Sequence, residues 1–157
     1  MICFISLLFV GLALIPAGAH FAELPNKLKL SRDDYFIVQQ IYRGWWLWGI
    51  VILPALLSTF YLTLISRPDA TNFRLSLLTF ICILATQVIF WLVTFPTNQA
   101  TANWTIVTTD WAGLRQRCEL SHAASGFFNL VALVLCSYRC CFGITDSSSV
   151  NTKQAES

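Results

Sequence analysis

The sequence predicts an all-α fold, an integral-membrane four-helix bundle, and composition is the first observation behind that prediction. The mean hydropathy of the 157 residues is +0.64, and only 11% of them are charged. Soluble domains carry about 25% charged residues, so this chain has too few charges to cover a water-facing surface. Lipid is therefore the expected solvent. The net charge of +2 is too small to indicate a nucleic-acid partner.

Four apolar runs are the second observation, because each can cross a hydrocarbon core that requires ~20 residues. The predicted spans are 2–19, 45–66, 74–95 and 121–138. We expect a kink at Pro54 in the second span, and we expect Pro96 to end the third. The spans predict a transmembrane domain at 1–141 and a disordered polar tail at 142–157. Such a multi-pass protein would lie in an endomembrane of a eukaryote or in the inner membrane of a bacterium.

The first apolar run also permits a second interpretation, a cleaved signal peptide. The run is short, and "AGAH" offers a small-residue cleavage site after Ala19. Against this, the charged segment that usually precedes such a run is missing. Cleavage would leave three spans, with His20 as the first residue.

Polar residues at the start of the fourth run share one face of a helix, which is the third observation. Their successive spacings of four, three, four and three residues define that face: Arg115, Glu119, His122, Gly126 and Asn129. Arg117 falls off this face, and we expect it to lie in solvent or among headgroups. Asp110 is the expected N-cap of the helix.

Similar spacings occur at the ends of the first and third runs. In the third run they align Gln87, Trp91, Thr94 and Asn98, and in the first they align His20 with Glu23. In an antiparallel four-helix arrangement these ends lie on the same side as the start of the fourth helix. We therefore expect one mouth of the bundle to gather six polar side chains: His20, Glu23, Asn98, Arg115, Glu119 and His122.

Two chemical interpretations of these residues stay open, beside a structural one in which they are interface anchors and packing hydrogen bonds. In the metal-free interpretation, His122 accepts a proton, Glu119 orients it, and Arg115 and Asn98 stabilise an oxyanion. In the metal interpretation, His20, Glu23, Glu119 and His122 bind iron, or the two histidines bracket a haem. The six cysteines show no CxxC spacing, so neither a zinc site nor a disulfide framework is indicated.

Three stretches carry a family resemblance: "GAHFAELP", "TFPTNQATANW" and "DWAGLRQRCELSHAAS". They resemble the small integral-membrane family that includes the fungal anthrone oxygenases, over roughly residues 10–135. The matching positions are Gly18, Glu23, Pro96, Asn98, Trp104, Trp111, Leu114, Arg115, Glu119 and His122. Cys118 stands where the family usually has Trp, so we expect a substrate whose shape differs from that of other members' substrates.

The resemblance implies a membrane-embedded oxygenase of secondary metabolism and favours a retained first helix. Such an enzyme would oxidise an apolar phenolic or polyketide substrate with O2 after His122 removes a proton, with no cofactor required. Iron or haem is the alternative. The residues assigned to substrate contact are Trp91, Trp104, Trp111 and Cys118. The expected partners are the lipid bilayer, an apolar aromatic molecule, O2 and a second copy of the chain. The rival hypothesis is a non-enzymatic membrane protein for ligand binding, transport or complex assembly.

Overall fold

The computed structural model describes residues 1–143, apart from the side chain of Trp46, and every regular element within that part is helical. The predicted all-α class is confirmed. Six α-helices are formed: α1 (Ile2–Lys27), α2 (Arg32–Gln39), α3 (Gly49–Ile65), α4 (Ala70–Ile89), α5 (Phe95–Ala100) and α6 (Trp111–Phe142). Short 3-10 turns at Gln40–Tyr42 and Trp45–Trp48 precede α3, and a π-helical turn at Phe90–Thr94 joins α4 to α5.

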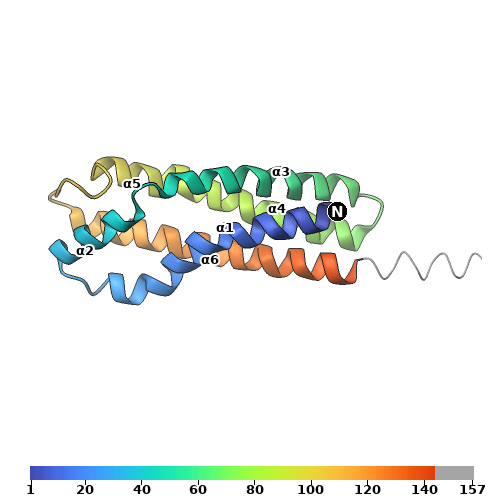
Figure 1. Ribbon diagram of the computed structural model, residues 1–157, viewed down its shortest axis with the longest axis horizontal. Helices are drawn as coiled ribbons and strands as arrows, with labels where there is room; N and C mark the ends of the chain where they lie inside the picture. Colours follow the sequence, from blue (N-terminus) through green and yellow to red (C-terminus); the bar gives the residue numbers. More distant parts are fainter. Residues whose placement is uncertain (144–157) are drawn as a thin grey trace, which may run out of the picture.

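Four long helices lie side by side, and the short elements cover one end of them (Figure 1). α1 packs against α3 and α6, and α4 packs against the same two helices. The N-terminus and the last turn of α6 lie at one end, whereas α2 and α5 lie at the other. We call these the open end and the covered end.

Three segments are long and apolar enough to cross a membrane: Ile2–Lys27, Ala70–Ala100 and Trp111–Phe142. α3 is apolar but shorter, because Trp45–Trp48 at the start of the predicted second span forms a 3-10 turn. α1 continues beyond the predicted end at residue 19 and passes the proposed cleavage site without a break. α6 begins ten residues before the predicted start at 121. Asp110 is its N-cap residue as predicted, although its side chain makes no capping hydrogen bond.

Pro54, in the predicted second span, and Pro96, directly after the predicted third span, both lie within helical segments. α3 runs through Pro54 as one helix. Pro96 lies in the first turn of α5, where its missing N–H costs no intrahelical hydrogen bond, and the π-helical turn before it accommodates the ring. The prediction that Pro96 closes the third span is therefore wrong, and the helical path continues to Ala100.

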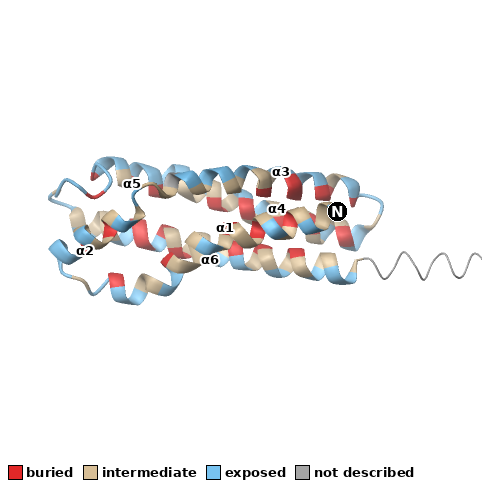
Figure 2. Cartoon of the chain, viewed as in Figure 1, coloured by how far each residue is buried: buried red, intermediate tan, exposed pale blue. Residues whose placement is uncertain are grey.

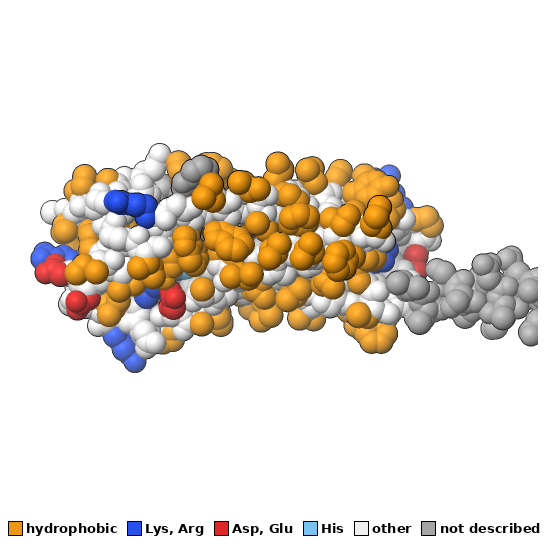
Figure 3. Space-filling model, in the orientation of Figure 1, with side chains coloured by type: hydrophobic (Ala, Val, Ile, Leu, Met, Phe, Trp, Pro, Cys, Tyr) orange, Lys and Arg blue, Asp and Glu red, His pale blue; other side chains and the backbone are white. Residues whose placement is uncertain are grey.

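Small and hydroxyl-bearing side chains fill the space between the long helices, while large apolar side chains face outward. Thr59 and Thr63 are buried and donate to carbonyl oxygens of their own helix, at 2.7 Å to Ala55 and 2.8 Å to Thr59. Leu57 and Phe60 on the same helix are 59% and 47% exposed. Buried residues lie on the inner faces throughout (Figure 2). In Figure 3 hydrophobic side chains cover the middle, and charged side chains gather toward the ends.

Close approach of α1 and α6 depends on Gly126. A Cβ atom at this position would lie 2.7 Å from the carbonyl oxygen of Ala17 and 3.0 Å from Cβ of Phe21. The two backbones therefore nearly touch at this level, which brings the polar residues on either side of Gly126 next to α1. At the C-terminus, Phe142 belongs to α6 rather than to the predicted tail. The rest of that tail, at 144–157, lies outside the described residues.

Candidate functional site

The covered end buries a lysine that sequence reasoning did not select. Lys27 is 3% exposed, and its Nζ lies 3.0 Å from Nδ1 of His20 and 3.0 Å from Oε2 of Glu23. The Oε1 atom of Glu119 lies 3.8 Å from the same nitrogen. The ammonium also lies 4.1 Å from the centre of the Tyr42 ring. One cation therefore joins an imidazole, two carboxylates and an aromatic face.

The helical repeat explains how α1 supplies three members of this group. His20, Glu23 and Lys27 are spaced by three and four residues, so they share one face of the helix. Pro25 lies between them, yet α1 continues through it to Lys27. The last turn of α1 therefore carries an uninterrupted polar face toward α6.

The two histidines of the chain stack face to face. The ring centres of His20 and His122 are 4.0 Å apart with 12° between the planes, which joins α1 to α6. Tyr42 and Trp45 from the 3-10 turns approach the His20 ring, with centres at 4.4 and 5.7 Å. Tyr42 also donates a hydrogen bond to Oε2 of Glu23. The histidine pair thus lies between α1 and α6, with the rings of Tyr42 and Trp45 packed against His20.

Glu119 is fully buried, and α2 supplies its partners. Its Oε1 accepts hydrogen bonds from Tyr35 Oη at 2.8 Å and from Gln39 Nε2 at 3.1 Å. Gln39 also donates to Tyr35 Oη, which links the two residues one helical turn apart. Among the described residues, the other carboxylate oxygen of Glu119, Oε2, is buried and has no hydrogen-bond partner. That oxygen can therefore accept a further hydrogen bond.

α2 forms because local signals favour a helix in the segment between the first and second predicted spans. Ser31 is the N-cap, and its Oγ accepts a hydrogen bond from Asp34 N at 3.2 Å. Asp33 and Asp34 lie in the first turn, where carboxylates interact favourably with the helix dipole. With its exposed side in solvent, α2 places Tyr35 and Gln39 over Glu119.

Two phenols of the cluster are held in the protonated form. Burial raises the pKa of Tyr35 above its ordinary value, and the nearby Cys118 and Glu119 raise it further. Burial also raises the pKa of Tyr42, together with its hydrogen bond to Glu23. Both side chains therefore stay hydrogen-bond donors to the carboxylates that they contact.

The two predicted anion stabilisers, Asn98 and Arg115, do not contact the histidine pair. Asn98 Oδ1 accepts a hydrogen bond from Trp104 Nε1 at 2.9 Å, and the Cys118 thiol lies 3.8 Å away. Arg115 donates from Nη1 to the carbonyl oxygen of Leu30 at 2.8 Å. Its guanidinium carbon lies 4.8 Å from the centre of the Trp111 ring. These contacts hold the connecting segments against α6. Asn98 and Arg115 therefore have a positioning role.

The four residues assigned to substrate contact differ in how far they are buried. Trp104 and Cys118 are buried at 4% and 1% exposure, and they pack with Tyr35 just behind Glu119. Trp111 is partly buried beneath Arg115. Trp91 is 58% exposed on the outer surface, so its predicted inward orientation is wrong.

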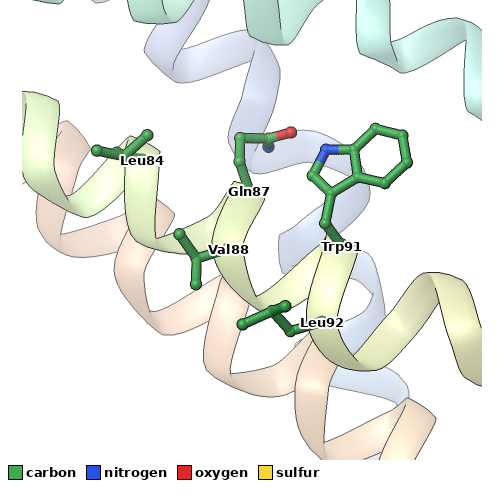
Figure 4. Close-up of a pocket in the computed structure, with 5 residues that line it drawn as sticks. All are labelled: Leu84, Gln87, Val88, Trp91 and Leu92. Carbon is green, nitrogen blue, oxygen red and sulfur yellow. The ribbon is translucent and has the colours of Figure 1, made fainter.

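A π-helical turn explains the error at Trp91. The buried face of α4 reaches Thr86 and reappears at Thr94, eight residues later, where a regular helix repeats after about seven. Counting at regular spacing therefore selected Gln87 and Trp91, which line a groove on the outside of α4 with Leu84, Val88 and Leu92. Figure 4 shows Gln87 and Trp91 on the same side of this helix.

The metal interpretation does not fit the geometry. Lys27 Nζ occupies the position between His20, Glu23 and Glu119 that a bound cation would need. Among residues 1–143, no group of three or more His, Cys, Asp or Glu side chains is arranged to hold a metal ion. The rings of His20 and His122 are in stacking contact, with centres 4.0 Å apart, and leave no space for a haem between them in this structure.

The sequence prediction identified four members of the cluster and missed four. His20, Glu23, Glu119 and His122 do come together from α1 and α6, as the helical spacings predicted. Lys27 could have been found by continuing the polar face of α1 by one turn beyond Glu23. Nothing in the local sequence pairs Tyr35, Gln39 or Tyr42 with α6.

Comparison with known proteins gives no relative: no family model, no curated protein and no solved structure matches the chain. The site is therefore interpreted from its own residues.

Proposed function

We propose that this protein is an integral-membrane oxygenase of the anthrone-oxygenase type, built as a four-helix bundle that oxidises an apolar phenolic substrate with O2. The observation that carries the proposal is the stacked histidine pair beside the buried Lys27 ammonium. A base next to a fixed positive charge is the arrangement that favours removal of a proton from a weak carbon acid.

The membrane location is supported by the distribution of side chains. Small residues and internally hydrogen-bonded Ser and Thr lie between the helices, and large apolar residues point outward, as is typical of helices packed in lipid. The polar cluster at the covered end would then lie near one interface of the bilayer. A flat phenolic molecule partitions to that depth, because its ring is apolar and its oxygen is polar.

His122 is the proposed base. Within the described residues its ring nitrogens accept and donate no hydrogen bond, so they are available to a substrate. His20 differs, because the Lys27 ammonium can only donate, and Nδ1 of His20 therefore acts as the acceptor. A neutral His20 then carries its proton on Nε2 and supports His122 through stacking.

Lys27 replaces Arg115 and Asn98 as the anion stabiliser in this proposal. Its positive charge is fixed next to the histidine pair by Glu23 and Glu119, so it would favour the substrate carbanion as His122 takes the proton. The electron-rich anion then passes electrons to O2. One oxygen atom becomes the new carbonyl oxygen, and the other leaves as water with the two hydrogens of the oxidised methylene group.

The test uses anthrone as the probe and the purified chain in lipid nanodiscs. Oxygen uptake and anthraquinone formation should be faster with the protein than with empty nanodiscs. His122→Ala should lose at least about 100-fold in rate, the usual contribution of a general base. Gln116→Ala, at an exposed position of α6, is the matched control and should keep the rate. Equal rates for wild type and His122→Ala would reject the proposal.

A second candidate function, assembly with another copy of the chain, is favoured by the groove around Gln87. This half-buried amide lies in a hydrophobic stretch of α4, and within the described part of the chain it donates only to Thr86 Oγ1, at 3.2 Å. Amides on apolar helices promote helix association in lipid. A homo-oligomer in detergent that dissociates in Gln87→Leu would support this candidate, and an unchanged state would reject it.

A further inference from the structure

A second polar cluster lies at the open end, where the first turn of α1 meets the last turns of α6. It consists of three cysteines and one arginine: Cys3, Cys136, Arg139 and Cys140. The 17 residues from Cys3 to His20 correspond to about 25 Å of helix, so this cluster is separate from the histidine pair. The inference below is independent of the proposed oxygenase function.

Arg139 directs its guanidinium at Cys3. Its Nη1 donates to Cys3 Sγ at 2.8 Å, and its Nη2 donates to Ser66 Oγ at 3.1 Å. The third nitrogen, Nε, is buried and has no hydrogen-bond partner among residues 1–143. A guanidinium at this distance stabilises negative charge on sulfur, and the thiolate is the form of cysteine that attacks disulfides.

Cys140 joins the last turn of α6 to the first turn of α1. Its thiol donates a hydrogen bond to the carbonyl oxygen of Cys3, with 3.5 Å between Sγ and the oxygen. Cys3 and Cys140 are partly exposed, whereas Cys136 is 1% exposed. A reagent from solution can therefore reach the pair that joins α1 to α6 more easily than it can reach Cys136.

Helix geometry selects which of these thiols can form a disulfide. Cys136 and Cys140 are four residues apart on α6, and such pairs have Cβ atoms about 5–6 Å apart. A disulfide needs Cβ atoms about 3.5–4.5 Å apart, so this pair cannot close without distorting the helix. Cys3 and Cys140 lie on different helices and are free of that restriction.

We propose that Cys3 and Cys140 form a thiol–disulfide exchange site that is oxidised by small-molecule disulfides of the glutathione type. The Cys3 thiolate attacks one sulfur of the disulfide, which forms a mixed disulfide and releases one thiolate. The Cys140 thiolate then attacks Cys3 Sγ and releases the second. Two protein thiols become one disulfide, and one small disulfide becomes two small thiols, so atoms and electrons balance.

The resulting bond would tie the first turn of α1 to the last turn of α6. Ser66, at the C-terminus of α3, joins the same contact through Arg139. The open end, which no short helix among residues 1–143 covers, would thereby gain a covalent link whose presence follows the thiol–disulfide balance of its surroundings.

The experiment treats the purified full-length chain in nanodiscs with glutathione disulfide and counts free thiols by maleimide labelling and mass spectrometry. The wild type should lose two of its six thiols, and peptide mapping should identify a bond between Cys3 and Cys140. Cys3→Ser and Cys140→Ser should form no internal disulfide. Cys141→Ser is the matched control, because this exposed thiol lies next to Cys140 in sequence and should leave the reaction unchanged.

Arg139→Gln adds a kinetic measurement. Loss of the guanidinium should slow oxidation by glutathione disulfide about tenfold, because less of Cys3 is available as thiolate. The proposal is overturned if all six wild-type thiols stay free after treatment. It is also overturned if glutathione stays attached to Cys3, or if the mapped bond joins another pair or two chains.

Discussion

The two ends of the molecule both place a cationic side chain between α1 and α6, but they compensate its charge differently. At the covered end Lys27 contacts two carboxylates and an imidazole, and it is almost fully buried. At the open end Arg139 contacts a thiol and a hydroxyl, and it is only partly buried. A buried charge needs an opposite charge or several hydrogen bonds, so only the covered end can keep an ion out of water.

The short elements explain this difference. α2 and the 3-10 turns place Tyr35, Gln39 and Tyr42 over the carboxylates at the covered end. The open end has no comparable cover in the described residues. A protected ionic site and an accessible thiol site thus occur on the same pair of helices, and substitutions at the two ends should have different effects.

The largest expected effect is the loss of Lys27. Lys27→Met should lower the free energy of unfolding by about 3–5 kcal/mol, because Glu23 and Glu119 are left without their cation. Arg139→Met is the matched variant at the open end, and it should cost only about 1–2 kcal/mol, because Arg139 contacts a thiol and a hydroxyl instead of two carboxylates. Thermal and denaturant unfolding in detergent measure both.

The double variant Lys27→Met with Glu119→Gln tests the cause of that difference. Removing the buried carboxylate should recover part of the stability lost by Lys27→Met, since the unpaired charge is gone. Equal losses for Lys27→Met and Arg139→Met would show that the two ends do not differ in the way described.

The contact between α1 and α6 midway between the two ends should be sensitive to side-chain volume. Gly126→Ala should cost about 1–3 kcal/mol, because the new Cβ would press against the backbone of Ala17. Gly11 lies on the same helix pair, and a Cβ added there would lie 4.0 Å from Leu133 Cδ1. Gly11→Ala should therefore be neutral or stabilising. A stable Gly126→Ala protein would mean that α1 and α6 can separate there without cost.

Relieving backbone strain at the covered end should have a smaller effect, and it should raise the free energy of unfolding. Three successive residues adopt positive φ angles: Ala102 at 47°, Asn103 at 57° and Trp104 at 63°. Ala102→Gly should raise the free energy of unfolding by about 1 kcal/mol, because glycine adopts this conformation without steric cost. Ala112→Gly, at an exposed position in α6, should instead lower it by about 1 kcal/mol. Destabilisation by Ala102→Gly would contradict this explanation.

Alkaline pH should weaken the covered end. The pKa values of Tyr35 and Tyr42 are raised in the folded state, so above the ordinary tyrosine pKa of about 10 the unfolded chain loses phenol protons that the folded chain keeps. The stability contributed by these phenols is complete below that pH and is lost as pH rises above it. Tyr35→Phe should reduce this alkaline loss in melting temperature, whereas Tyr61→Phe, at a 54% exposed position, should not. If the melting temperature fell equally with rising pH in Tyr35→Phe and Tyr61→Phe, the alkaline loss could not be assigned to Tyr35.

Local periodicity explains which features the sequence could predict. The polar face of α6 from Arg115 to Asn129 depends only on helical spacing, and Glu119, Gly126 and Asn129 are buried as expected while Arg117 is exposed. The same counting failed on α4, because the π-helical turn adds a residue to the repeat at a place that no local signal marks.

Contacts between distant segments account for the rest. Lys27 was missed because the first span was predicted to end with its apolar run at residue 19, whereas α1 continues to Lys27. Tyr35 reaches Glu119 across 84 residues, and Cys140 reaches Cys3 across 137. Such pairs depend on how the helices are arranged in space, and neither composition nor spacing within one segment contains that information.

The covered end is proposed as a reaction site in which His122 removes a proton beside Lys27. The decisive measurement is anthrone-dependent oxygen uptake in nanodiscs, with wild type, His122→Ala and Gln116→Ala compared at equal protein amounts and matched melting temperatures. We expect uptake in the wild type, an unchanged rate in Gln116→Ala and a loss of at least about 100-fold in His122→Ala. Uptake that is the same in all three proteins, or no higher than in empty nanodiscs, would show that the covered end is not such a site.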